Sequence, residues 1–202
     1  MKKVFCSLIV MAFLSLVISC NKEKDNQSSA SAIEGNWKFI SISAKTQSTV
    51  LYKDPDDGTK YMTVTKSDYT SADNGGTVSF SPSTMTGTGV TYTINATAYT
   101  QSYVDGQLED TDSYPFTFTY PPTNSTSAYK IIGQDSIYSA GQTLVSGQGT
   151  SGSTRPSGLK FTIAGNTLTM TGNFLKDTVI NYAGEILNQH ETLEASLILQ
   201  KQ

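Results

Sequence analysis

The segment 90–104, whose side chains alternate cleanly at first, is the feature that most limits the possible folds of this chain. A period of two residues is typical of a β-strand with one buried face. Asp105–Gly106 comes next, and this dipeptide favours a tight hairpin turn. The segment therefore predicts a long hairpin. The side chains that share the buried face of its first strand are Val90, Tyr92, Ile94, Ala96 and Ala98.

The strand that returns from this turn carries aromatic side chains at alternate positions. A strict two-residue turn would place Tyr92 and Phe118 on opposite faces of the hairpin, so a bulge or an odd-length loop is needed to align them. Pro121–Pro122 predicts the end of the strand, because proline cannot donate to a sheet ladder. The aromatic face comprises Tyr114, Phe116, Phe118 and Tyr120.

The rest of the chain is rich in Thr, Ser, Tyr and Gly and lacks long helical periodicity. Residues 146–158 predict a mobile Gly- and Ser-rich loop, and residues 186–190 predict a single helical turn. About eight to ten strands joined by short turns indicate an all-β fold. We expect a single antiparallel meander barrel, with a β-sandwich as the alternative. Further strands are predicted at 35–43, 61–65, 76–80, 129–132, 136–139, 159–163, 168–172 and 193–201.

The N-terminus has the pattern of a secretory leader. Lys2 and Lys3 precede the apolar run Val4–Ile18, and small Ser19 follows it. This order of charge, apolar run and small residue is typical of a signal peptide. The run is shorter than the roughly 20 residues that a membrane-spanning helix needs. We therefore expect residues 1–19 to be a cleaved signal peptide, with an uncleaved anchor as the alternative.

The cleavage site itself is more specific. Val17-Ile18-Ser19-Cys20 resembles the lipobox of bacterial lipoproteins. The resemblance implies that Cys20 carries a diacylglycerol and that its new amine is acylated. Several acyl chains on one residue anchor a protein almost permanently, since burial contributes about 0.8 kcal/mol per methylene. The expected partner is thus a membrane, bound through Cys20. Cys6 would leave with the leader, so the mature chain would have no disulfide.

Residues 20–32 are polar and predict a lipidated flexible tether. Asn21, directly after the cysteine, resembles the outer-membrane lipoproteins of Gram-negative cells, and Lys22–Asp25 resembles signals that send some of them to the outer surface. The expected location is the cell outer membrane, with the lipid-anchored domain on its periplasmic or cell-surface face. No later shift in composition divides the chain, so residues 33–202 are expected to form one domain.

A second resemblance begins at Gly35-Asn36-Trp37. This triplet is similar to the Gly-x-Trp element of lipocalins and of lipocalin-like bacterial lipoproteins, as are the hairpin at 163–170 and a last strand ending in Lys201. The resemblance implies a lipocalin-like barrel with structural roles for Gly35 and Trp37. In that family the tryptophan packs against an arginine of the last strand. Here Lys201 or Arg155 is expected to place a cation over the indole.

Candidate catalytic and metal-binding groups are sparse. His190 is the only histidine, and its polar surroundings predict a loop or turn. No Gly-x-Ser-x-Gly elbow accompanies it. The carboxylate clusters at 54–58 and 109–112 predict turns. A calcium ion bound by Asp54–Asp57 is the minor alternative. We therefore expect no catalytic residues, no metal site, no cofactor and no enzyme activity.

The charge pattern limits the partners. The formal net charge is −3 and Arg155 is the only arginine, so no basic cluster could follow a phosphate backbone. Nucleic acid is not an expected partner.

Four aromatic residues are candidates for ligand binding. They are either plain core or the lining of a cup for an apolar or sugar-like molecule. The expected function is that of a membrane-anchored, non-catalytic lipocalin-like domain that binds a small hydrophobic ligand or serves as an envelope scaffold. The alternative is a surface β-sandwich that binds glycans or host proteins. The candidate ligand-binding residues are Tyr92, Tyr114, Phe116 and Phe118.

Overall fold

The structure is a computed structural model that describes residues 32–139, 157–182 and 185–202. The expected signal peptide, Cys20 and nearly all of the expected tether lie outside these residues. In the described part, no helix has the length and apolar character needed to cross a membrane. The strands are β1 (Gly35–Lys53), β2 (Lys60–Thr70), β3 (Ala72–Phe80), β4 (Thr84–Val104), β5 (Gln107–Ile132), β6 (Ser136–Ser139), β7 (Ser157–Ala164), β8 (Thr167–Tyr182) and β9 (Glu185–Lys201).

These strands form one antiparallel sheet that closes on itself. Consecutive strands pair from β3 to β9, and β9 then pairs with β1 to close the ring. β2 and β3 share one place in the ring, because both pair with β1 and with β4. The predicted all-β antiparallel meander barrel is confirmed, and a closed ring is a different architecture from the alternative sandwich.

The junction between β2 and β3 bends this shared place. Ser71 N–H donates to Ile42 O at 2.8 Å, and its hydroxyl accepts from Ile42 N–H at 2.9 Å. Both bonds keep the chain attached to β1 while its direction changes. Gly76 follows with a φ of 95°, and a Cβ there would lie 2.5 Å from Gly89 O. The close approach of the two backbones therefore requires glycine.

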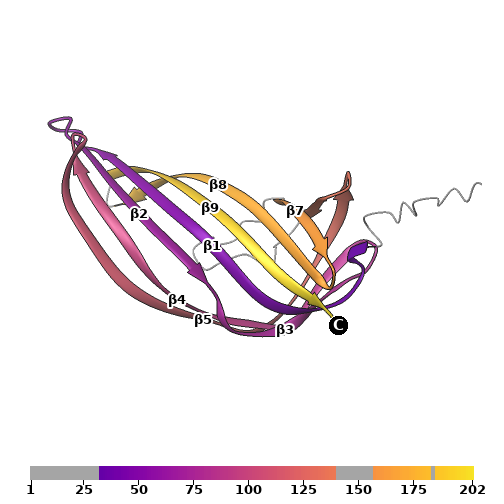
Figure 1. The fold of residues 1–202 in the computed structure, drawn as a ribbon. Coiled ribbons are helices and arrows are strands. Elements are labelled where there is room, and N and C mark those ends of the chain that lie inside the picture. The colour runs from indigo at the N-terminus through magenta and orange to yellow at the C-terminus, as the bar shows by residue number, and fades with distance from the viewer. Residues whose placement is uncertain (1–31, 140–156, 183–184) are drawn as a thin grey trace, which may run out of the picture.

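The barrel has a closed half and an open half (Figure 1). The short strands β6 and β7 complete the ring beside the end of β5 and the beginning of β8. Among the described strands, the part of β5 before Tyr129 pairs only with β4, and the part of β8 beyond Thr171 pairs only with β9. In the open half, strands β5, β4, β2, β1, β9 and β8 form one continuous curved sheet.

The apolar core fills the closed half. Trp37, Leu168 and Leu199 are completely buried. Trp37 Nε1 donates to Ile33 O at 2.8 Å, and Lys201 Nζ lies 5.4 Å from the centre of its indole. The expected cation over the tryptophan is thus Lys201, while Arg155 lies outside the described residues. Other buried members of the core include Phe39, Ile42, Val78, Tyr92, Ile137, Met170 and Leu197.

The long hairpin contains the bulge that its sequence requires. Asp105 and Gly106 have φ values of 47° and 83°, as expected for a two-residue turn with two left-handed positions. Val104 pairs with Gln107, but the register shifts between Ser102 and Tyr103, so that Ser102 pairs with Asp110. Glu109 is the extra residue. Downstream of it, the aromatic side chains of β5 lie on the same inner face as those of β4.

Pro121–Pro122 does not end the returning strand, which continues to Ile132. The register of the β4–β5 pair shifts beside these prolines, between Val90 and Tyr92. Side chains supply bonds in this irregular stretch, since Thr91 Oγ1 donates to Tyr120 O at 2.8 Å and Asn124 Oδ1 accepts from Gly89 N–H at 2.8 Å. The prediction was wrong because prolines are tolerated at bulges and on edge strands.

The predicted helical turn at 186–190 is also wrong. These residues belong to β9, which pairs with both β1 and β8 along this stretch. Two neighbouring strands outweigh a weak local preference. Most of the predicted loop at 146–158 lies outside the described residues, but its last two residues begin β7.

Candidate binding site in the open half

Two adjacent rows of inward-facing side chains form a largely polar layer across the open half. Side chains of a strand alternate between its faces, and the strand pairings place one residue of each strand in each row. We call these two rows the polar layer. In the order β8, β9, β1, β2, β4 and β5, the first row is Lys176, Glu191, Ser48, Thr65, Thr100 and Asp112, and the second is Thr178, Gln189, Val50, Thr63, Ser102 and Asp110.

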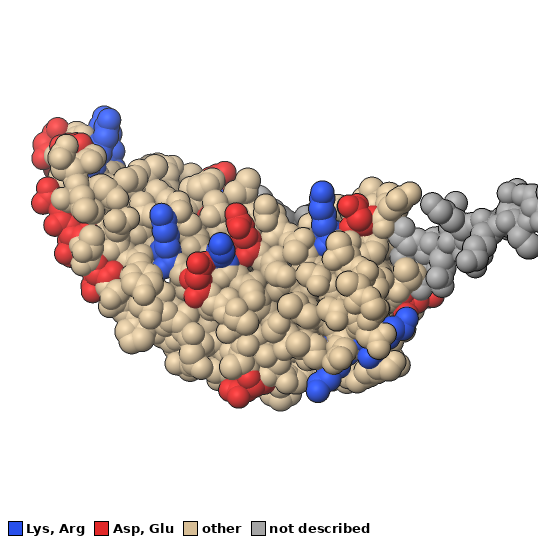
Figure 2. Space-filling model, viewed as in Figure 1, with Lys and Arg blue, Asp and Glu red and all other residues tan. Residues whose placement is uncertain are grey.

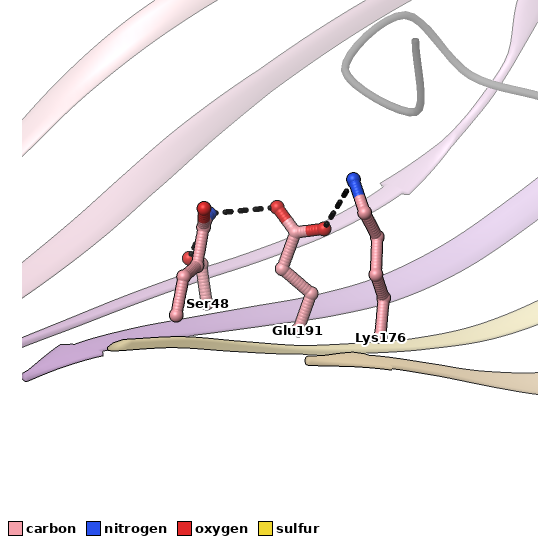
Figure 3. A network of polar contacts seen from close by, with 4 residues as sticks. Ser48, Lys176 and Glu191 are labelled. Carbon is pink, nitrogen blue, oxygen red and sulfur yellow. Dashed lines mark hydrogen bonds and ion pairs between the residues drawn. The ribbon is translucent and has the colours of Figure 1, made fainter. Parts of the chain in front are cut away.

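A hydrogen-bonded network lies at the centre of this layer (Figure 3). The Gln189 side-chain amide donates to Ser48 Oγ at 3.1 Å and to Glu191 Oε1 at 2.8 Å. Lys176 Nζ lies 3.8 Å from Glu191 Oε2. The side chains of Lys176 and Glu191 are 35% and 30% exposed. These groups are therefore held in place by one another and still reach solvent.

Several hydroxyl groups around the network retain hydrogen-bonding capacity. Thr65 and Thr100 share one hydrogen bond of 3.1 Å. Next to the layer, Ser67 is 8% exposed, and its Oγ is buried without a hydrogen-bond partner in the described part of the chain. A buried hydroxyl left unpaired costs about 1–3 kcal/mol. The layer thus has donors and acceptors that a ligand could use.

The acidic residues at the β5 end of the layer lie where β4 is the only neighbour of β5 among the described strands. Asp110 Oδ1 accepts from Thr111 N–H at 2.8 Å, and Asp112 Oδ1 accepts from Ser113 N–H at 2.7 Å. Carboxylates on a strand edge discourage the addition of another strand. The predicted turn at 109–112 is wrong, because these residues lie within β5. Acidic side chains gather at this end of the molecule in Figure 2.

The four aromatic candidates for ligand binding lie at different depths. Tyr92 is 2% exposed and stacks on Tyr120 with 5.0 Å between ring centres. Burial, with smaller contributions from Tyr69 and Tyr120, raises the pKa of Tyr92 to about 12. Phe116 and Phe118 are partly buried against the core, whereas Tyr114 is 49% exposed. Of the four, Tyr114 is the one whose ring is accessible.

A second aromatic pair lies beyond the polar layer, near the tip of the open half. Tyr52 and Tyr61 face each other across β1 and β2 and stack with 5.8 Å between ring centres. Tyr61 is 41% exposed. Burial and the nearby Glu185 raise the pKa of the Tyr52 hydroxyl. Aromatic groups therefore border the polar layer on both sides.

Sequence reasoning missed the polar layer. Its hydroxyl residues stand among others of the same type, as in Ser48-Thr49 and Thr63-Val64-Thr65. Such stretches do not reveal which residue faces inward. Only the pairing of β8, β9 and β1 brings Lys176 next to Glu191 and Ser48.

His190 lies on the outer face, on β9 rather than in the predicted loop or turn. Its Nδ1 is 2.6 Å from Asp177 Oδ1, and the two side chains are 47% and 82% exposed. Within the described ranges, no Ser or Thr hydroxyl hydrogen-bonds with His190. The pair is therefore exposed to solvent on the outer face.

The predicted turn at 54–58 is confirmed. Its carboxylates bind their own loop, since Asp54 Oδ1 accepts from Asp56 N–H and Asp57 Oδ1 accepts from Thr59 N–H, both at 2.8 Å. The bonds from Thr59 lower the pKa of Asp57. The structure, over the residues that it describes, contains no group of three or more His, Cys, Asp or Glu side chains placed to hold a metal ion.

A shallow groove crosses the outer face, away from the polar layer. Its volume is about 570 Å³, and the strands at its floor are β2, β1, β9 and β8. Lys45 lies directly between Asp68 and Glu194 in the strand register. Alternating charges and short side chains give this groove no clear preference for one kind of ligand.

Comparison with protein-family models found no match, and neither did comparison with curated proteins. Among solved structures, Ail, the attachment invasion locus protein of Yersinia pestis, aligns with 82% of this chain and 99% of its own. The sequence identity is 8% and the TM-score is 0.23. A likeness this weak supports no inference about function.

Proposed function

We propose that this chain is a membrane-anchored, non-catalytic binding protein of the bacterial outer membrane whose ligand lies in the open half of the barrel. The observation that carries the proposal is the polar layer, in which Lys176, Glu191 and Gln189 form a fixed and solvent-accessible network. A small number of fixed polar groups that can orient a ligand is typical of binding sites.

The distribution of side chains supports a ligand in the open half rather than in the closed half. Trp37, Leu168 and Leu199 are completely buried, so the closed half is filled by its own residues. A hydrophobic ligand would have to lie on the polar layer instead. Burying hydroxyl and charged groups beneath an apolar surface without new hydrogen bonds is unfavourable.

The lipobox at Val17–Cys20 supports the anchor. A fractionation experiment tests it: the chain should be found in the outer membrane, and Cys20→Ser should release it into the soluble fraction. Ser19→Ala, which keeps a small residue before the cysteine, serves as the matched control and should remain in the membrane. A Cys20→Ser protein that still sediments with membranes would contradict the anchor.

Ligand binding is tested by native mass spectrometry of the full-length Cys20→Ser chain purified from the periplasm. We expect a non-covalent adduct that disappears in the Lys176→Met/Gln189→Ala double variant, because that variant removes the centre of the network. Thr49→Ala, on the outer face beside Ser48, should keep the adduct. An adduct that the double variant retains, or a protein without any adduct, would contradict a ligand in the open half.

A further inference from the structure

We infer that the ligand of the open half is a neutral oligosaccharide. The inference rests on the proposed binding function and specifies the chemistry of its ligand. It follows from three properties of the polar layer: its hydrogen-bonding groups, its balance of charge and the aromatic rings that border it.

The hydrogen-bonding groups of the layer suit a ligand that carries many hydroxyls. Thr63, Ser102 and Thr178 make no side-chain hydrogen bond within the described part of the chain. Gln189 uses its amide hydrogens on Ser48 and Glu191, which leaves its carbonyl oxygen as a fixed acceptor. Sugar hydroxyls both donate and accept, so they can satisfy such a mixture, whereas an acyl chain can satisfy none of it.

The buried hydroxyl of Ser67 is an independent observation that points to the same ligand. It lies on the inner face of β2, two residues from Thr65, and its Oγ is unpartnered. Native proteins rarely leave such a group unsatisfied. Because Ser67 Oγ is buried, a hydroxyl of the ligand would reach it once the Ser67 side chain rotates toward the interior of the open half.

The charges disfavour an anionic ligand. Within the layer Lys176 is paired with Glu191, so neither is a free counter-ion. Asp110 and Asp112 stand at the β5 edge and give that margin a negative charge. A ligand that bears carboxylate or phosphate groups would meet repulsion there without a free cation in the layer to offset it.

The aromatic rings and the length of the layer fit a chain of sugar rings. Exposed Tyr114 lies on one side of the layer and exposed Tyr61 on the other, and aromatic faces offer apolar contact with a polar tip. Neighbouring strands are about 4.8 Å apart, so six strands extend on the order of 24 Å along the sheet. That length accommodates an oligosaccharide rather than a single sugar.

The inference is tested by isothermal titration of the full-length Cys20→Ser chain with maltohexaose, cellohexaose and laminarihexaose. Hexagalacturonate serves as the anionic probe of similar shape, and palmitate as the apolar probe. We expect at least one neutral hexasaccharide to bind more tightly than hexagalacturonate and palmitate. Gln189→Ala should weaken that binding by about tenfold, the effect of losing roughly 1.4 kcal/mol of hydrogen bonding. Gln47→Ala, on the outer face of β1, should leave it unchanged.

Ser67→Ala separates recognition from folding. Because it removes a buried unpaired hydroxyl, it should leave the melting temperature of the free protein unchanged or raise it, while the affinity for the neutral hexasaccharide falls several-fold. A drop in melting temperature with unchanged affinity would show that Ser67 serves the fold alone and would remove this support.

The outcomes distinguish this inference from the proposed function. If palmitate or hexagalacturonate binds through Gln189 and no neutral saccharide does, the inference fails while a binding function in the open half stands. Neutral saccharides that bind equally well to Gln189→Ala would place their site elsewhere and overturn the inference. If no probe binds and native mass spectrometry shows no adduct, both fail.

Discussion

At the scale of single residues, Trp37 and Lys201 show how the ends of the chain secure the closed half. Trp37 lies near the beginning of β1 and Lys201 at the end of β9, and the two residues pair directly across the strands. The indole donates to Ile33 O on one side and faces the ammonium group of Lys201 on the other. The lysine therefore supplies the cation–π contact that the lipocalin resemblance would assign to arginine.

We expect Lys201→Ala to lower the free energy of unfolding by about 0.5–1 kcal/mol, the size of an exposed cation–π contact. Lys201→Arg should retain it, because a guanidinium also packs on an indole. Lys38→Ala, also a change of an exposed lysine, is the control and should change stability little. Urea unfolding followed by tryptophan fluorescence measures all three, and equal losses for Ala and Arg would contradict the contact.

Because of Tyr92, the free energy of unfolding of the barrel should decrease as the pH rises through the alkaline range. Its folded pKa of about 12 lies above the ordinary value of 10.0, so the unfolded chain loses this proton first. The contribution is fully present below about pH 10 and is lost as the pH rises toward about 12. In Tyr92→Phe the decline of unfolding free energy over this range should be shallower. Urea unfolding at a series of alkaline pH values checks this, and identical slopes would refute it.

At the scale of elements, one inserted residue determines which face of β5 is buried. With Glu109 as a bulge, Ile94 pairs with Phe118 and Ala96 with Phe116, and both aromatic rings face inward. A shift of one residue would turn every side chain of the strand to the other face. The bulge is therefore a condition for packing the aromatic face of β5 against the core.

Deletion of Glu109 should severely destabilise the domain, because the strand must either expose its aromatic face or distort the turn. Glu109→Ala keeps the bulge and should be nearly neutral. Near-ultraviolet circular dichroism and thermal unfolding compare the two variants. A deletion variant with native dichroism and an unchanged melting temperature would show that the register is fixed elsewhere.

Two glycines on adjacent strands provide a matched test of the close approach of β3 and β4. Gly76 has a φ of 95°, and a Cβ added there would clash with Gly89 O. Gly89 has a φ of 58°, and a Cβ added there would have no atom within 4 Å. Gly89→Ala should cost about 1 kcal/mol for its backbone conformation alone. Gly76→Ala should cost clearly more, because the strands must also separate. Chemical unfolding ranks them, and the opposite order would contradict this account.

At the scale of the whole molecule, the barrel is divided into an apolar half and a polar half. The closed half has a filled core and a complete ring of strands, whereas strands β5 and β8 of the open half lack a second described neighbour. Burial and complete hydrogen bonding give the closed half its stability. The open half contains the polar layer, whose Lys176 and Glu191 side chains are partly exposed.

Hydrogen exchange should reflect this division. Amides of β1 and β9 around Ile42 and Leu197 should exchange most slowly, because they are enclosed by neighbouring strands and buried side chains. Amides of β8 beyond Gly172 should exchange much faster, since local opening there exposes little apolar surface. Mass spectrometry of peptic peptides measures this, and uniform protection along β8 would argue against two halves of unequal stability.

The class of the fold follows from the amino-acid sequence alone. Alternation at 90–104, the Asp105–Gly106 turn and the need for a bulge follow from local geometry, because a strand has a period of two wherever it lies. The hairpin around Gly165 and the inward face of the last strand are local in the same sense. These features can be predicted without knowing which strands are neighbours in the folded protein.

The extent of the strands and the place of the candidate site depend on contacts between residues that are distant in the sequence. β9 includes residues that predict a helical turn, and β5 continues through two prolines, because neighbouring strands and bulges outweigh local preference. The candidate site contains a network of Lys176, Glu191, Gln189 and Ser48. In the sequence, Ser48 lies more than 120 positions from the other three residues. The bond between Gln189 and Ser48 depends on the register between β1 and β9, which forms only when the ring closes.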